Sequence, residues 1–445
     1  MQAFHREPDW LTVMADGTVK QLNPFSATEV WTVAGRGNRP LGISLPPPVP
    51  LDPDQHGRYC PFCEHRYLET PPEKSRMVRQ PDGSRRISYG TTAEELFAST
   101  AEFRRVPNLF EILSYQYWHA NYGYTLPARV AARKAAYLES PAGRAHVLGV
   151  ARSKLLAGGR TPAQVDAMTL DEQLEFASGF FGGGHDVIVS RRHYVDGAVD
   201  STQLAGSGTM TPDEHFHLLA FTVESISALF NLNRYARYVV VFQNWLRPAG
   251  ASFDHLHKQL VAVDERGVQA ERAVAQLRAN PNVFNEDAVN YAGYKNLVVA
   301  ENDHAIAFAG FGHRFPSLEI YSKSAECDPW EQSPEELRGM SDMVHAMHAA
   351  TGVDVPSNEE WHYRPIDVDV AMPWRIVLKW RISTLAGFEG ATKIYLNTLD
   401  PWAIYDRTVP KLAALRDDGL IAADLRIGSE AECRPNSLRY NAGGR

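Results

Sequence analysis

The sequence of 445 residues is poor in cysteine and has no long apolar run. Its four cysteines are too few and too scattered to form a disulfide framework. No stretch approaches the roughly 20 apolar residues that a membrane-spanning helix needs, and the opening residues lack the basic-then-apolar order of a signal peptide. We therefore expect a soluble protein of the cytoplasm that has no membrane partner.

The sequence also lacks an excess of positive charge. Lysine and arginine together number 45, aspartate and glutamate 53, so the formal net charge is −8. Because a nucleic-acid-binding protein needs a basic surface, this charge argues against a nucleic-acid partner, although a few arginines can still hold a single nucleotide. Hydrophobic residues make up 44% of the chain and charged residues 22%, which is ordinary for a globular protein.

Strands and helices follow each other in a similar order in the two halves of the chain. In the first half, the pattern predicts strands at 185–190, 238–245 and 255–263 and a helix at 213–230. The second half gives a weaker echo, with strands at 305–311, 317–323 and 373–382 and a helix at 334–351. This order suggests an internal duplication. Residues 115–182, which are rich in Ala, Leu, Arg and Glu, predict a helical insertion with breaks at Pro141 and Gly158.

The string GASFDHLHKQ, residues 250–259, concentrates polar side chains on one strand. Side chains alternate along a strand, so His255, His257 and Gln259 share one face, each about 6–7 Å from the next. The preceding turn, Gly250 to Ser252, can let a phosphate approach its backbone donors. Two other interpretations stay open, surface histidines on an edge strand and two histidines that ligate one metal.

The string CPFC, Cys60 to Cys63, is the second chemical signal. Two thiolates at this spacing suit tetrahedral zinc, whereas a redox pair would begin a helix after a strand. The residues that follow are a poor first helix, which favours zinc over redox chemistry. Since no second CxxC exists, the two remaining ligands of a zinc ion would have to be histidines.

Six strings together resemble the galactose-1-phosphate uridylyltransferase family of the histidine triad superfamily, which includes nucleotide-sugar phosphorylases. They occur in the family's order and cover most of the chain outside the insertion. The strings are NPFSATEVWTVAGRGNRP (23–40), CPFC with TPPE (60–73), FRRVPNLF (103–110), GHDVIVSRRH (184–193), QNW with GASFDHLHKQ (243–259) and AGFEGATKIYLN (386–397).

The resemblance implies an α+β fold, a duplicated histidine-triad unit with mainly antiparallel sheets, flanking helices and the helical insertion. Its N-terminal half would span residues 1–268, with the zinc knuckle and the active-site strand, and its C-terminal half residues 269–445. The resemblance also implies one structural Zn²⁺ site per chain and a homodimer. The matching zinc ligands are Cys60, Cys63, His193 and His255.

The resemblance further implies a nucleotidyltransferase of the hexose-1-phosphate uridylyltransferase type. His257 matches the nucleophile, which would carry a nucleoside monophosphate in a ping-pong reaction from a nucleotide sugar to a phosphate-bearing acceptor. Gln259 and Ser252 would stabilise charge on the phosphoryl oxygens, and the second imidazole nitrogen should donate to a backbone carbonyl. The nucleotide-binding matches are Arg36, Arg39, Asn108, Asn244, Gly250 and Ser252.

The sequence departs from the family at two points besides the insertion. The active run is His255-Leu256-His257 rather than His-Pro-His, which restores an N–H that proline lacks. The second His-x-His of the family is replaced by Pro373-Trp374-Arg375, so we expect no second metal site. Three alternatives remain open: a phosphorylase, a nucleotide phosphodiester hydrolase, and a zinc-stabilised binding protein without catalysis.

Overall fold

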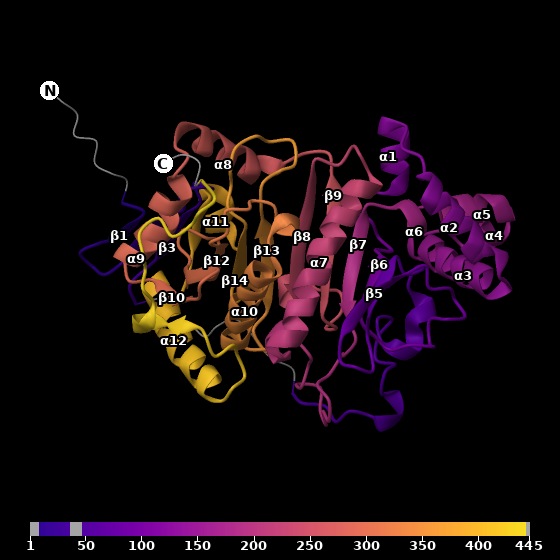
Figure 1. The fold of residues 1–445 in the computed structure, drawn as a ribbon, viewed down its shortest axis with the longest axis horizontal. Helices are drawn as coiled ribbons and strands as arrows, with labels where there is room; N and C mark the ends of the chain where they lie inside the picture. The colour runs from indigo at the N-terminus through magenta and orange to yellow at the C-terminus, as the bar shows by residue number, and fades with distance from the viewer. Residues whose placement is uncertain (1–8, 36–46, 442–445) are drawn as a thin grey trace.

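A 12-stranded sheet runs through the computed structural model, which describes residues 9–35 and 47–441 (Figure 1). The strand order is β16-β10-β11-β12-β14-β13-β8-β9-β7-β6-β4-β5, and neighbouring strands pair antiparallel. The strands are β4 (Ser75–Arg79), β5 (Arg85–Tyr89), β6 (Ala101–Pro107), β7 (His185–Ser190), β8 (Tyr238–Trp245), β9 (His257–Val263), β10 (Val298–Glu301), β11 (Ala305–Ala309), β12 (Ser317–Ser322), β13 (Ser357–His362), β14 (Arg375–Trp380) and β16 (Arg426–Ile427).

The strand order is that of a duplicated unit. The succession β6-β7-α7-β8-β9 in the first half is repeated as β11-β12-α10-β13-β14 in the second. In the sheet the two sets run β6-β7-β9-β8 and β11-β12-β14-β13, and they meet where β8 pairs with β13. The expected α+β class with antiparallel sheets is therefore confirmed. The boundary near residue 268 stays a prediction, because one sheet spans both halves.

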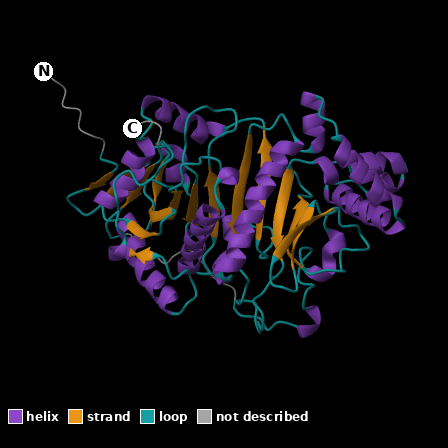
Figure 2. Cartoon of the chain, in the orientation of Figure 1, coloured by secondary structure: helices purple, strands orange, loops and turns teal. Residues whose placement is uncertain are grey.

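The helices α7 and α10 lie side by side over one face of the sheet (Figures 1 and 2). Each begins with the same signal, a proline at the first turn and a capping box, formed by Thr211 with Glu214 and by Ser333 with Glu336. The helices are α1 (Tyr115–Tyr122), α2 (Ala128–Glu139), α3 (Pro141–Ala157), α4 (Pro162–Asp166), α5 (Leu170–Phe176), α6 (Gly179–Gly182), α7 (Pro212–Leu232), α8 (Gly267–Ala279), α9 (Tyr291–Tyr294), α10 (Pro334–Thr351), α11 (Gly387–Thr392) and α12 (Pro401–Asp417).

The helical insertion is present and consists of α1 to α6, gathered at one end of the molecule (Figure 1). The predicted breaks are where they were expected, since Ser140 caps α3 ahead of Pro141 and α3 ends at Gly158. The insertion has a small apolar core of its own, in which Tyr137, Val147 and Phe181 are buried. Among the helices of the described chain, none has the length and apolarity that crossing a membrane requires.

A second, four-stranded sheet joins the two ends of the chain. It consists of β1 (Leu11–Val13), β2 (Val19–Leu22), β3 (Glu29–Thr32) and β15 (Ile394–Leu396), and β15 pairs parallel to β3. The side chain of Asn23, just after β2, donates to the carbonyl of Phe311, so the N-terminal segment lies against the second half of the chain.

One strand begins later than the sequence predicted. The strand expected at 255–263 starts at His257, and His255 lies in the bend before it. Nε2 of His255 donates to the carbonyl of Ser190 at 2.6 Å, so this residue contacts the end of β7 through its side chain. His255 and His257 lie close together, but the alternation of side chains along a strand does not explain the orientation of His255, which lies outside the strand.

Candidate functional site

Four side chains from three separate segments meet in one cluster. Cys60 and Cys63 come from the turn before a short 3₁₀ helix, Glu64–Glu69, His193 follows β7, and His255 precedes β9. Their potential ligand atoms all lie within 4.8 Å of one another, and three of the four residues are buried. We call these four residues the Cys2His2 cluster.

The interatomic distances in the Cys2His2 cluster fit a tetrahedral metal. The two sulfurs are 3.8 Å apart, Nδ1 of His255 is 3.4 Å from the sulfur of Cys60, and Nδ1 of His193 is 3.5 Å from the sulfur of Cys63. A tetrahedron with metal–sulfur bonds of ~2.3 Å and metal–nitrogen bonds of ~2.0–2.1 Å has sulfur–sulfur and sulfur–nitrogen edges of about 3.8 and 3.6 Å. The residues present therefore fit a closed metal site.

The protonation of the cluster also suits metal binding. Because Nε2 of His255 donates to the Ser190 carbonyl, its Nδ1 presents a lone pair to the thiols. The hydrogen bond from the Cys60 thiol lowers the pKa of Cys63 and favours its thiolate. A histidine nitrogen also lies at each sulfur, 3.4 Å from that of Cys60 and 3.5 Å from that of Cys63, which a metal site needs and a redox thiol pair does not. The geometry therefore favours metal over redox chemistry.

His257 lies next to the Cys2His2 cluster and outside it. Its Nδ1 donates to the carbonyl of His255 at 2.7 Å, the backbone contact that the sequence analysis expected. The ring of Phe62, from the CPFC turn, packs against His257 at 5.3 Å between centroids. Burial lowers the pKa of His257, so the imidazole is neutral near pH 7 and Nε2 carries its lone pair. Within the described ranges Nε2 makes no hydrogen bond, so it is free to act as a nucleophile.

Gln259 is held by two side chains, those of Asn108 just after β6 and of His185 at the start of β7. Its Oε1 accepts from Nε2 of His185 at 3.0 Å and from Nδ2 of Asn108 at 3.3 Å. The backbone N–H of Ile112 donates to Nδ1 of His185, which leaves the proton on Nε2. Burial lowers the pKa of His185 to about 4, so it stays neutral. Two donors on one oxygen fix the amide so that its NH₂ group is left for a ligand.

The sequence analysis missed His185 as a site residue. The string GHDVIV was quoted for its resemblance alone, and no role was given to its histidine. The sequence did contain a signal, because His185 opens the strand that pairs with the strand of His257 and Gln259. When the register pairs His185 with Val261, its side chain lies on the same sheet face as His257 and Gln259. Only the register of β7 on β9 shows that this is so.

Asn244 lies on the same sheet face as His257, and a residue from the second half holds it. The register pairs Gln243 with Lys258, so the next position, Asn244, falls beside His257. Oδ1 of Asn244 accepts from Nδ2 of Asn358 at 2.7 Å, and Arg381 donates to Oδ1 of Asn358 at 2.7 Å. Asn358 and Arg381 were not expected, because only the pairing of β8 with β13 brings them here.

A cavity of about 620 Å³ lies on this face between β8, β13 and the start of α8. Its lining includes Phe242, Asn244, Asn358, Glu360 and Arg381, and its size is ordinary for a small-molecule site. It provides amide and guanidinium donors next to the strand that carries His257.

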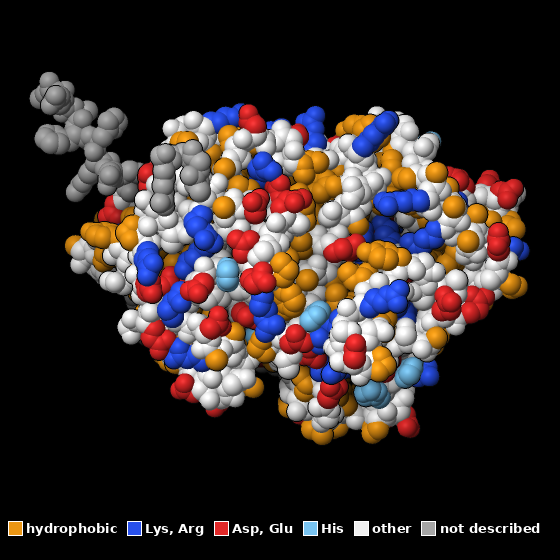
Figure 3. Space-filling model, in the orientation of Figure 1, with side chains coloured by type: hydrophobic (Ala, Val, Ile, Leu, Met, Phe, Trp, Pro, Cys, Tyr) orange, Lys and Arg blue, Asp and Glu red, His pale blue; other side chains and the backbone are white. Residues whose placement is uncertain are grey.

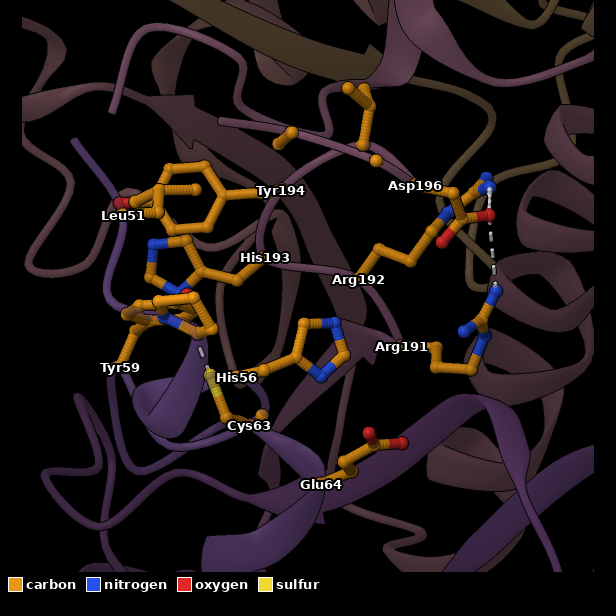
Figure 4. A pocket seen from close by; sticks show the side chains of 15 residues that line it. Leu51, His56, Tyr59, Cys63, Glu64, Arg191, Arg192, His193, Tyr194 and Asp196 are labelled. Carbon is orange, nitrogen blue, oxygen red and sulfur yellow. Dashed lines mark hydrogen bonds and ion pairs between the residues drawn. The ribbon is translucent and has the colours of Figure 1, made fainter. Parts of the chain in front are cut away.

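A second cavity, of about 340 Å³, borders the Cys2His2 cluster on its other side (Figure 4). Figure 4 shows His193 directed toward Cys63, with Tyr194 and Tyr59 nearby and with Arg191 and Arg192 on the far wall. Arg192 is paired with Asp196 at 3.0 Å, so its charge is already compensated. His257 lines neither this cavity nor the one of about 620 Å³, but Asn244, its neighbour in the sheet, lines the larger one.

Four further residues were predicted to bind the nucleotide: Gly250, Ser252, Arg36 and Arg39. Gly250 adopts φ +90°, a left-handed conformation that favours glycine, at the turn after β8. Ser252 is exposed and makes no hydrogen bond with the described part of the chain. Arg36 and Arg39 lie outside the described residues.

Solved structures with a similar fold support the resemblance found in the sequence. A crystal structure of an ADP-glucose phosphorylase from Arabidopsis thaliana with bound ADP-glucose has a TM-score of 0.56 and 18% identity, covering 88% of this chain and 98% of that one. A GalT-like protein from Arabidopsis thaliana has a TM-score of 0.52 and 19% identity, covering 80% and 92%. The fold expected from the resemblance is confirmed.

In sequence, the chain is 24% identical to the curated ADP-glucose phosphorylase of Arabidopsis thaliana over 233 residues. That match covers 49% of this chain and 62% of the relative, which is less than two thirds of its length. Residues 14–440 match a family described as a domain of unknown function, DUF4921, and the chain therefore belongs to that family.

Proposed function

We propose that this protein is a nucleotidyltransferase that carries a nucleoside monophosphate on His257. The observation that supports this most is the state of His257, a buried neutral imidazole whose Nδ1 is committed to the His255 carbonyl and whose Nε2 is free. The nucleotide-sugar phosphorylase of similar fold, crystallised with ADP-glucose, supports a nucleotide sugar as donor.

The proposed reaction has two displacements. In the first, Nε2 of His257 attacks the α-phosphorus of the nucleotide sugar, an N–P bond forms, and the bond to the sugar phosphate breaks. In the second, an oxygen of a phosphate-bearing acceptor attacks the same phosphorus and the N–P bond breaks. The acceptor is a sugar phosphate in a transferase and inorganic phosphate in a phosphorylase, the activity named for the relative.

The fixed amide of Gln259 would donate to a non-bridging oxygen as charge builds on the phosphoryl group. His185 is a positioning residue, since it acts through Gln259. We assign nucleotide contacts to Asn108, Asn244, Gly250 and Ser252, as the resemblance implied. Arg36 and Arg39 keep the same proposed role.

We propose that the Cys2His2 cluster holds one Zn²⁺ ion with a structural role. When bound, the ion would fix the CPFC turn and the start of β9 relative to each other. Phe62 of that turn packs against the His257 ring, so the turn also helps to position the nucleophile. A homodimer and a cytoplasmic location, both implied or expected from the sequence, complete the proposal.

The test is covalent capture of the nucleotide. The protein is incubated with α-³²P-labelled ADP-glucose and, separately, UDP-glucose, denatured in alkali, and examined for retained label. We expect label on the wild type, none on His257→Ala, and wild-type labelling of His217→Asn, a histidine on α7 that lies on the helix-covered side of the sheet. Addition of phosphate or glucose 1-phosphate should discharge the label.

Three outcomes would replace the proposal. Turnover of nucleotide sugar without any trapped label, at unchanged rate in His257→Ala, would contradict a covalent histidine. Steady release of nucleoside monophosphate without added phosphate or sugar phosphate would show a hydrolase. Binding without turnover of either donor would leave a non-catalytic binding protein.

A further inference from the structure

A cavity of about 730 Å³ lies on the sheet face opposite to His257, between α7 and the helical insertion. Arg105 of β6 lines it. Arg105 pairs with Ile188 of β7, and Ile188 pairs with Lys258 of β9, so the side chains of Arg105 and Lys258 lie on the same face of the sheet. His257 precedes Lys258 and therefore faces the other way. The cavity is separate from the candidate active site.

The wall formed by α7 leaves room because its side chains are small. The residues that line the cavity are spaced at three and four positions, as one stripe of a helix is. Most of them are alanine, serine or valine, so they do not fill the space up to the insertion helices. The stripe consists of Ala220, Val223, Glu224, Ser227, Ala228 and Asn231.

The opposite wall carries four cations. Lys74 and Arg105 are both buried and both pair with Asp186, at 2.6 and 2.7 Å. The remaining two, Arg129 and Arg133, come from α2 of the insertion. Figure 3 shows Lys and Arg side chains gathered between α7 and the insertion.

The positive charge is only partly compensated locally. Within the described ranges, no carboxylate lies within ion-pair distance of Arg129 or Arg133. Arg133 is partly buried and donates to the backbone carbonyl of Glu73, while its Nε finds no partner in the described chain. Glu224 is the one carboxylate among the lining residues, and Asp186 is paired with Lys74 and Arg105. Four cations therefore face two carboxylates. The whole chain has a net charge of −8, so this excess of positive charge is a local property of the cavity.

Burial of an unpaired guanidinium is unfavourable unless a ligand accepts its hydrogen bonds. Burial, and then the charge of Arg105, lowers the pKa of Arg133, as expected for two guanidinium groups that share one low-dielectric wall. Guanidinium groups match phosphate oxygens in geometry and charge. The apolar end of the cavity, with Phe181, Trp330 and Leu337, offers a surface for an organic group.

We propose that this cavity binds a phosphorylated small metabolite. Its phosphate groups lie against Arg105, Arg129 and Arg133, and its organic part lies along α7 toward Trp330. The cavity is large enough for a nucleotide or a sugar phosphate. The site does not depend on the proposed transfer reaction at His257.

The experiment is calorimetric titration with inorganic pyrophosphate and, separately, ATP, which carries the same phosphate chemistry on an organic group. We expect both to bind and ATP to bind more tightly. The Arg129→Gln, Arg133→Gln double variant should weaken pyrophosphate binding at least ~10-fold, because it removes two guanidinium groups that donate charge-assisted hydrogen bonds. Glu224→Gln should tighten binding, and His257→Asn should leave the cavity's affinity unchanged.

Arg129→Glu serves as a second variant, because Arg129 is exposed and its replacement leaves the fold intact. Pyrophosphate affinity equal to that of the wild type in both arginine variants would overturn the proposal. So would binding that is lost in His257→Asn alone, since that result assigns the anion to the other face of the sheet. A failure to trap label on His257 would not affect either measurement.

Discussion

Replacing His255 by alanine should remove the metal from the Cys2His2 cluster, whereas replacing His257 should leave it bound. The two residues are two positions apart on one segment, yet of the two only His255 has a ring nitrogen near the sulfurs, at 3.4 and 3.7 Å from those of Cys60 and Cys63. Nδ1 of His257 is directed at the His255 carbonyl instead. The pair therefore separates the proposed metal ligand from the proposed nucleophile.

The magnitude follows from the geometry. A sulfur–sulfur edge of 3.8 Å places the centre of a regular tetrahedron about 2.3 Å from each sulfur, the usual Zn–S bond. Structural zinc sites bind with about 10–16 kcal/mol. Loss of one of four ligands removes on the order of a quarter of this, ~3–4 kcal/mol, so the affinity should fall roughly 10²- to 10³-fold.

The assay is metal analysis of purified protein, followed by competition with a chromophoric chelator. Wild type and His257→Ala should each hold about one zinc per chain, and His255→Ala should lose it to the chelator. His255→Cys should restore binding, because a Cys3His site also suits zinc. Equal loss of metal in both alanine variants would refute the reasoning and support a shared ligand role for the two histidines. A wild type without zinc would refute the site itself.

Two buried charges give further predictions. Glu359→Leu should lower the free energy of unfolding, measured by urea denaturation, by about 3–5 kcal/mol, because it leaves Lys258 buried and unpaired. Adding Lys258→Met to the same chain should recover most of that loss. A double variant as unstable as Glu359→Leu alone would contradict this prediction. Burial raises the pKa of Glu111 to about 7. The folded chain therefore keeps a proton that the unfolded chain loses near its ordinary pKa, and stability falls by about 3 kcal/mol as the pH rises from about 4.5 to 7. Glu111→Gln should abolish that part of the pH dependence, and a curve identical to that of the wild type would disprove the assignment.

The elements of regular structure were largely readable from the sequence. The strands β7 and β8 begin and end at the predicted residues, and α7 extends the predicted helix by one or two residues at each end. These segments combine an apolar periodicity with a clear start or stop signal, such as Thr211 and Pro212 at α7. The strand that carries His257 was misjudged at its start, because His255 lies in the bend before it and contacts Ser190 through its side chain.

The site could be predicted only in part. The motifs CPFC and HLHKQ gave the cysteines and both active-run histidines, because their chemistry depends on local spacing. His185, Asn358 and Arg381 were missed because each reaches the site through strand register, and Asn358 does so from the other half of the chain. No local pattern encodes such a pairing, which the burial of whole sheet faces decides.

The sequence by itself determined the chemical inventory: a thiol pair, two closely spaced histidines, an amide and a helical insertion, in a chain without excess positive charge. Only the tertiary structure decided which groups meet. It brought His193 to the thiols, turned one imidazole toward the sulfurs and the next toward a carbonyl, and set four cations around a cavity on the far side of the sheet. The physical reason is that hydrogen bonds and ion pairs act over a few ångströms, so their partners exist only once the two halves of the sheet have paired.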